Sequence, residues 1–175
     1  MSAARYRVAR LAPDFDLESF DCGAPAYNTW LRQHAASSVQ AGICAVYLLI
    51  ETHNDRTRVV GYYAINPTLV VRESVPRTIA RGWPDSVPAW KLGKLAVHLD
   101  LRADSQAEWG RHLLRNALET IVGVAETGSG KVIVADADNE ELMSFYMRNG
   151  FTPTGVDGDL SLYLKISTAR KALLR

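Results

Sequence analysis

The sequence lacks several features that would place it in a specialised class of protein. It has two cysteines, Cys22 and Cys44, and four histidines, and their spacing does not match a zinc site. We therefore expect reduced thiols and no metal. The formal net charge is only +1, which argues against a polyanion binder driven by net charge but allows a local basic patch.

Long apolar runs are also missing. No stretch is long enough to cross a membrane, and the N-terminal segment MSAARYRVAR has no apolar signal core. We therefore expect a cytoplasmic protein without membrane contact. The chain of 175 residues has no repeat, low-complexity tract or linker, which suits a single domain over residues 1–175. The basic tail, residues 166–175, is expected to be mobile.

What the sequence does contain is an alternation of strand and helix patterns. Strand patterns occupy Tyr6–Leu11, Ala45–Glu51, Val59–Val71, Lys91–Leu99, Lys131–Ala137 and Leu160–Ile166. Helical patterns follow Pro25, Trp109 and Asn139, with a further short helix near Arg77–Arg81. Hairpins at the front and βα units at the back predict an α/β (α+β) fold, a mixed sheet of six to seven strands flanked by about four helices.

Local signals refine this picture. Asn54 and Asp55 favour a turn between two strands, and Pro67 should break, bulge or end the ladder of its strand. Asn139 is suited to cap the helix that follows it. The stretch Arg72–Pro88 is long, polar and irregular, and it is either a binding surface or an ordinary solvated excursion.

The segment Lys91–Leu118 reads as a strand, a loop and a long amphipathic helix. The start of such a helix presents unpaired N–H groups and a positive dipole end, which is a common place for phosphate to bind. Most strand–loop–helix units bind nothing, so the pattern alone leaves both readings open.

Five pieces of the chain, taken in order, resemble GNAT-fold N-acetyltransferases that use acetyl-CoA. More narrowly they resemble the GNAT toxins of bacterial toxin–antitoxin pairs, whose partners are ribbon-helix-helix antitoxins. The pieces are FDCGAPAYNTWLR, VVGYYAI, PDSVPAWKLGKLAV, GRHLLRNAL and NEELMSFYMRNGF, and they span nearly the whole chain. The resemblance implies a GNAT fold, a homodimer, and transfer of acetyl to the α-amino group of an aminoacyl-tRNA, which blocks translation.

The resemblance also implies roles for individual residues. Tyr146 would be the general acid. Acetyl-CoA would contact three groups of residues: Leu95, Ala96 and Val97 along the pantetheine arm; Glu108, Trp109, Gly110 and Arg111 at the pyrophosphate; Asn139 and Phe145 at the thiol end.

The phosphate loop departs from the family pattern Q/R-x-x-G-x-G/A. Ser105 and Glu108 stand where Gln or Arg and the first glycine belong, and Gly110 is retained. A glutamate at this point adds a side chain and a negative charge that faces phosphate. Arg102 and Arg111, or a loop that turns Glu108 to solvent, can offset this effect.

The proposed chemistry needs little help from a base. An α-amino group has a pKa of about 8, so a sizeable fraction is neutral at cell pH, and a phenol is a suitable proton donor to a leaving thiolate. Main-chain N–H groups can stabilise the developing oxyanion. His98 and Glu51 are the base candidates, and for His98 the alternative is a structural strand residue.

A tRNA substrate requires a basic surface. The candidates are Arg32, Arg72, Arg77, Arg81, Lys91 and Lys94, with Trp83 or Trp90 for stacking. The alternative is that these are scattered solvated charges. Two other functions also stay open, a GNAT enzyme for another small-molecule or peptide amine and a degenerate GNAT-fold binding module without acetyl-CoA turnover.

Overall fold

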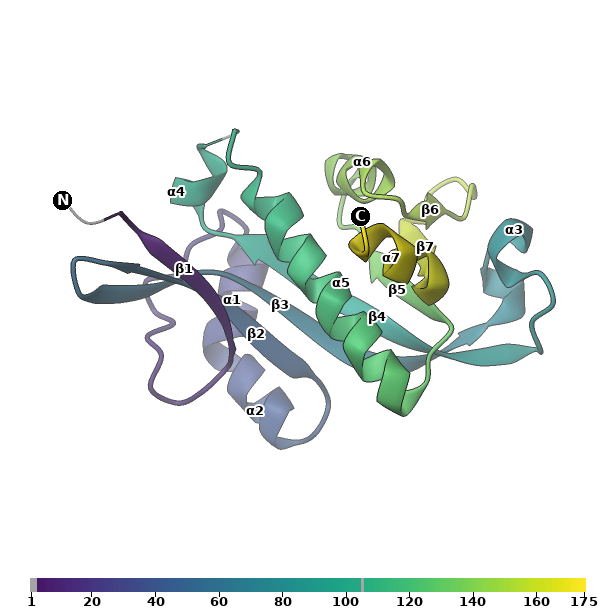
Figure 1. Ribbon diagram of the computed structural model, residues 1–175, viewed down its shortest axis with the longest axis horizontal. Coiled ribbons are helices and arrows are strands. Elements are labelled where there is room, and N and C mark those ends of the chain that lie inside the picture. Colours follow the sequence, from purple (N-terminus) through teal and green to yellow (C-terminus); the bar gives the residue numbers. More distant parts are fainter. Residues whose placement is uncertain (1–2, 105) are drawn as a thin grey trace. The chain divides into compact units, whose positions relative to one another are not determined.

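The computed structural model describes residues 3–104 and 106–175 (Figure 1). The chain divides into two compact units, the first made of Met1–Ile65 and Lys94–Leu114 and the second of Asn66–Gly93 and Arg115–Arg175. Strands β3 and β4 and helix α5 run from one unit into the other. The strands follow the order β1-β2-β3-β4-β5-β7-β6, so the predicted mixed sheet of six to seven strands is confirmed.

The first unit begins with an antiparallel meander. β1 (Arg5–Arg10) pairs with β2 (Ala45–His53), and β2 pairs with β3 (Arg56–Val71) through the predicted turn, where Asn54 and Asp55 both have positive φ. The end of β4 (Ser86–Val97) completes this unit's strands. Between β1 and β2 the chain forms α1 (Pro25–Gln33) and α2 (Ala35–Gln40), and Pro25 occupies the first turn of α1 as expected.

The two faces of this meander are covered by different helices (Figure 1). Even-numbered side chains of β2 pack with Phe20, Leu31 and Ala35 in a buried cluster on the α1 and α2 side. On the other face, a Cβ placed on Gly61 of β3 would lie 3.3 Å from the Leu113 side chain at the start of α5 (Trp109–Gly128). β2 and β3 therefore have buried side chains on both of their faces, whereas β1 has none.

Pro67 lies at the point where the β2 ladder stops. The last pair of β2 and β3 is Ala45 with Ile65, and β3 continues beyond it to Val71 without β2. Proline has no N–H to give to a ladder, so it is tolerated here.

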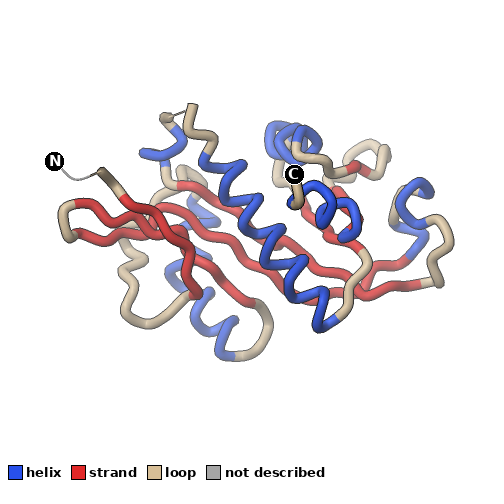
Figure 2. The backbone as a smooth tube through the Cα atoms, in the orientation of Figure 1, coloured by secondary structure: helices blue, strands red, loops and turns tan. Residues whose placement is uncertain are grey.

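The second unit has a buried core on one side of its strands. β4 pairs in parallel with β5 (Val132–Asp136), and β5 pairs antiparallel with β7 (Ser161–Lys165), which also pairs with β6 (Thr152–Pro153). An excursion connects β3 to β4 and contains η1 (Arg72–Ser74) and α3 (Arg77–Ala80) (Figure 2). Its Ile79 and Trp83 pack into this core with Val132 and Tyr163.

The remaining helices are α4 (Leu99–Arg102), α6 (Glu140–Arg148) and α7 (Ile166–Leu173). The mobile tail expected over residues 166–175 is wrong for most of that stretch, because Ile166 and Ala169 are buried one turn apart on α7. Within the described residues, the protein has no helix both long enough and apolar enough to pass through a membrane.

Gly61 is needed for the close approach of β4. A Cβ on this residue would lie 3.1 Å from the carbonyl oxygen of Ala96, which is backbone and cannot rotate away. We predict that Gly61→Ala lowers the free energy of unfolding by about 1–3 kcal/mol, because the crowded strands must separate. The measurement is equilibrium urea unfolding.

Gly123→Ala is the matched control. Gly123 lies within α5 with open space around its Cα, so alanine there should raise the free energy of unfolding by about 1 kcal/mol. Equal effects of the two substitutions would contradict the role of Gly61.

Candidate active site

The predicted site residues fall into two sets, one on each unit. The first unit carries Leu95–Val97, Glu108–Arg111, Arg32 and Lys94, and the second carries Asn139, Phe145, Tyr146, Arg77, Arg81 and Lys91. Ser105 lies outside the described residues. The two sets are considered separately below.

The segment Leu95–Val97 has a free main-chain edge. On one side β3 holds it, since the N–H of His98 donates to the carbonyl of Val60 at 2.8 Å. On the other side the β5 ladder covers only Ala89–Leu92 and stops before this segment. Among the described residues, the second edge of Leu95–Val97 therefore has no strand partner, and its N–H and C=O groups suit an extended ligand with amide groups.

The start of α5 offers main-chain donors that have no intrahelical partner among the described residues. The first helical bond runs from the N–H of His112 to the carbonyl of Glu108 at 3.1 Å, so the N–H groups of Trp109, Gly110 and Arg111 precede the helical ladder. This end of a 20-residue helix also carries the positive end of its dipole. The arrangement favours an anion.

Glu108 keeps the backbone conformation expected of a glycine. Its φ is +48°, in the left-handed region that side chains rarely adopt. Its carboxylate lies 3.5 Å from the guanidinium of Arg111, and both side chains are more than half exposed. The loop therefore turns Glu108 to solvent and towards Arg111, as one of the predicted alternatives required.

Arg102 does not offset the charge of Glu108 in the way the sequence suggested. Its guanidinium donates to the carbonyl of Cys22 at 2.8 Å and holds the segment before α1. Arg111 is the cation that pairs with Glu108.

The structure engages both base candidates elsewhere. Glu51 pairs with the guanidinium of Arg58 at 2.5 Å and accepts a hydrogen bond from the Tyr6 hydroxyl. His98 caps α4, because its Nδ1 accepts from the N–H of Asp100 at 3.1 Å, which assigns the ring proton to Nε2. His98 is thus held as a cap, the structural alternative, and Glu51 is held by Arg58 and Tyr6.

Tyr146 lies on α6, which begins as predicted. The Asn139 side chain accepts from the N–H of Leu142 at 2.8 Å and caps the helix. Tyr146 is 2 % exposed and packs between Phe145 and Phe151. Burial, and after it the charges of Asp138 and Asp136, raises the pKa of the Tyr146 phenol above its ordinary value. The phenol therefore keeps its proton at neutral pH.

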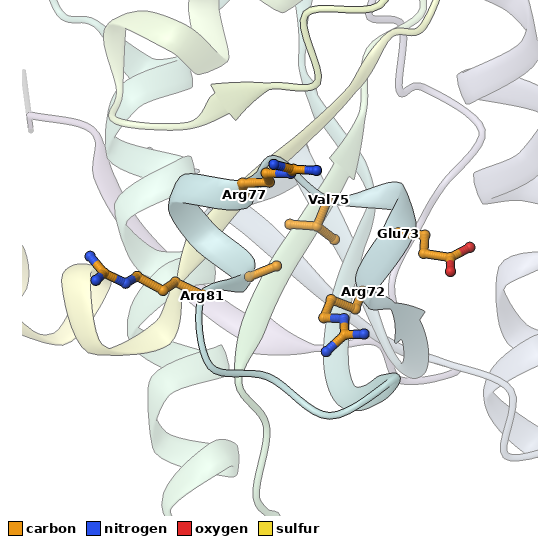
Figure 3. A pocket seen from close by; sticks show the side chains of 6 residues that line it. Arg72, Glu73, Val75, Arg77 and Arg81 are labelled. Atoms are coloured by element: carbon orange, nitrogen blue, oxygen red, sulfur yellow. The ribbon is translucent and has the colours of Figure 1, made fainter.

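Several basic candidates are already engaged within their own unit. Lys94 lies over the rings of Tyr27 and Trp30, 5.0 and 5.1 Å from their centroids, and Arg32 donates to the carbonyl of Phe20. Lys91 pairs with Asp136 at 2.6 Å. Arg77 and Arg81 line a pocket of the second unit together with Arg72 (Figure 3).

The expected stacking by Trp83 is wrong. Its side chain is 5 % exposed, because it fills the core under the excursion. Trp90 is half-buried, its Nε1 donates to the carbonyl of Ser129, and its ring lies against Gly130. Both rings serve packing within the second unit.

Sequence reasoning also missed the role of Gly61, which brings the Ala96 carbonyl close to β3. The available signal was an isolated glycine inside the strand pattern VVGYYAI, which often marks a close backbone approach.

The raised pKa of Tyr146 predicts a pH dependence of stability. The folded protein holds this proton more tightly than the unfolded chain, whose phenol titrates near pH 10, so the contribution is present below about pH 10 and lost above it. We predict that Tyr146→Phe loses less free energy of unfolding than the unmodified protein between about pH 9 and pH 11. The measurement is urea unfolding of both proteins across that pH range. An equal fall in the free energy of unfolding of the two proteins would contradict a raised pKa for Tyr146.

Comparisons with known proteins agree with this fold. No model of a known protein family matches the chain. It is 34% identical over 163 residues to the tRNA-acetylating toxin of Mycobacterium tuberculosis, covering 92% of each chain. The structure of AtaT complexed with acetyl-methionyl-tRNAfMet superposes with a TM-score of 0.85 at 24% identity, covering 98% of this chain and 100% of that one. A variant of AtaT bound to acetyl-CoA and the C-terminus of the antitoxin AtaR superposes with a TM-score of 0.79 at 22% identity, covering 97% of this chain and 99% of that one.

The predicted resemblance is thus confirmed, and the chain belongs to the family of GNAT toxins that includes the tRNA-acetylating toxin of M. tuberculosis.

Proposed function

We propose that this protein transfers an acetyl group from acetyl-CoA to the α-amino group of an aminoacyl-tRNA and so blocks translation. The observation that carries the proposal is its 34% identity, over 92% of the chain, to a relative named for tRNA acetylation. The edge of β4 that the β5 ladder does not cover, the N–H groups at the start of α5 and the buried phenol of Tyr146 support it from the structure.

The residues of the first unit fit acetyl-CoA in two respects. The main-chain edge at Leu95–Val97 suits the amide groups of a pantetheine arm, and the N–H groups at Trp109–Arg111 suit a diphosphate. Acetyl-CoA supplies an activated acyl group as a thioester. In this proposal the main-chain N–H groups of Leu95–Val97 orient the acyl carbonyl and stabilise its developing negative charge.

We assign Tyr146 as the proton donor to the leaving thiolate. The Tyr146 phenol is protonated at neutral pH, as a proton donor must be, and burial raises its pKa further above that range. Phe145 contacts Tyr146 on α6, Asn139 caps the same helix, and we assign both to the thiol end of the cofactor. No separate base is assigned, since Glu51 and His98 are engaged and an α-amino acceptor is partly neutral at about pH 7 to 8. The proton that the nitrogen loses as the amide forms returns to the Tyr146 oxygen, which has given its own proton to the thiolate.

The wider setting follows from the same proposal. A charged-tRNA substrate places the protein in the cytoplasm, and the resemblance suggests a homodimer held inactive by a ribbon-helix-helix antitoxin. The related AtaT has been solved with the C-terminus of its antitoxin AtaR, which supports the antitoxin partner. We further propose that both units, residues 1–175, work as one catalytic domain.

The test of the reaction is acetyl transfer from labelled acetyl-CoA to a mixture of charged tRNAs. We predict that Tyr146→Phe lowers the rate by about 10²–10⁴-fold, because a positioned proton donor is lost. Tyr47→Phe is the control: it removes the hydroxyl of a half-buried tyrosine outside α6 and should keep the rate. Label appearing only on polyamines or peptides would instead favour another amine acceptor.

Glu108 predicts a variant with higher affinity for the cofactor. In Glu108→Gly the left-handed backbone is free of strain, and the negative charge facing phosphate is gone. The Kd of acetyl-CoA should therefore fall roughly 3- to 10-fold, which corresponds to about 1 kcal/mol of binding free energy. Isothermal calorimetry measures the effect without turnover.

Glu108→Gln separates the two causes, since it keeps the side chain and removes only the charge. If the charge of Glu108 is the main cause of weak binding, Glu108→Gln should show most of the fall in the Kd of acetyl-CoA that Glu108→Gly shows. A folded protein that binds no acetyl-CoA in all three forms would overturn the transferase and leave the degenerate binding module.

A further inference from the structure

The second unit contains a pocket that none of the proposed catalytic residues lines. Its volume is about 570 Å³, and it is formed by the excursion between β3 and β4 (Figure 3). The lining residues are Arg72, Glu73, Val75, Arg77, Ala80 and Arg81. Three guanidinium groups and one carboxylate give this small surface a net charge of +2, against +1 for the whole chain.

The walls of the pocket are held by the protein itself. The N–H of Arg72 donates to the carbonyl of Asp85 at 2.8 Å and closes the base of the excursion. The Arg72 guanidinium donates to the carbonyl of Trp83 at 3.0 Å and to the Asp85 carboxylate at 3.2 Å. Val75 and Ala80 are buried and form an apolar floor. The site therefore exists before a ligand arrives.

Arg77 and Arg81 have a different character. Each is exposed, and among the described residues neither forms an ion pair or side-chain hydrogen bond. They lie four residues apart at α3, where like charges repel. Figure 3 shows the carboxylate of Glu73 extending away from the labelled arginines. Two cations are thus left for an external anion.

The spacing of the charges points to an extended polyanion. In Figure 3 the side chains of Arg72, Arg77 and Arg81 lie on different sides of Val75 and do not converge on one point, as they would for a single ion. Guanidinium groups match phosphate oxygens with paired N–H donors. Trp83 is buried and no exposed ring lines the pocket, so stacking on bases has no platform here.

We propose that the pocket of Arg72, Arg77 and Arg81 binds successive backbone phosphates of the RNA substrate, without reading its sequence. The inference rests on the proposed function, because that function supplies an RNA ligand. Contact with the backbone adds affinity that is independent of the aminoacyl group and of acetyl-CoA.

The experiment uses Arg77→Gln/Arg81→Gln in the full chain. Arg72 is left intact because it holds the excursion together. Fluorescence anisotropy with uncharged tRNA measures the Kd at several salt concentrations, and calorimetry measures acetyl-CoA binding. Arg170→Gln/Lys171→Gln is the control, since it removes two positive charges from α7 in the same unit.

We expect the Arg77/Arg81 variant to bind tRNA at least tenfold more weakly and to reduce the slope of log K against log salt by about 1 per arginine that meets a phosphate. Acetyl-CoA binding should stay unchanged, which also shows that the variant is folded. The loss should be the same for tRNAs of different sequence, and the control should bind as the unmodified protein does.

Three results would overturn the inference. One is unchanged tRNA affinity and salt slope in the variant, while the unmodified protein still binds and acetylates charged tRNA. Another is an equal loss in the control, which would indicate net charge alone. The third comes from repeating the anisotropy measurement with an oligoglutamate peptide. If the Arg77/Arg81 variant loses binding to this peptide but still binds tRNA, the ligand of the pocket is an acidic peptide. If the unmodified protein neither binds nor acetylates tRNA, the proposed function itself fails.

Discussion

The main-chain edge of Leu95–Val97 is the constraint on which the rest of the proposed chemistry depends. Backbone N–H and C=O groups need partners, and here β3 supplies them on one side while the β5 ladder ends at Leu92. Gly61 permits this arrangement, because any larger residue would push against the carbonyl of Ala96. An extended substrate can therefore complete the sheet where the protein leaves it incomplete.

Two local charge imbalances mark the surfaces at which ligands are proposed. At the start of α5, Glu108 replaces a glycine of the family pattern yet keeps a positive φ, and Arg111 partly neutralises it. In the excursion, Arg77 and Arg81 face solvent beside the fixed Arg72. The first imbalance weakens an anion site and the second creates one, although the net charge of the whole chain is close to zero.

Much of the fold followed from periodicity and local signals. The hairpin of β2 and β3, the amphipathic α5 and the Asn139 cap were all predicted, because each depends on neighbouring residues. The C-terminal helix was missed, since its basic residues concealed the buried pair of Ile166 and Ala169. The short helix α4 was missed because histidine is an uncommon cap.

By itself the sequence determined the order of the longer strands and helices, the family and the identity of the candidate residues, because these depend on spacing and residue type along the chain. Only the tertiary structure decided which candidates are available. Arg102 and Trp83 were taken up by partners distant in sequence, and Glu51 and His98 by partners only a few residues away. Among the described residues, Arg77 and Arg81 form no ion pair and line a preformed pocket. Whether a charge or a ring is free to act depends on what folding brings next to it, and such contacts leave little trace in one sequence.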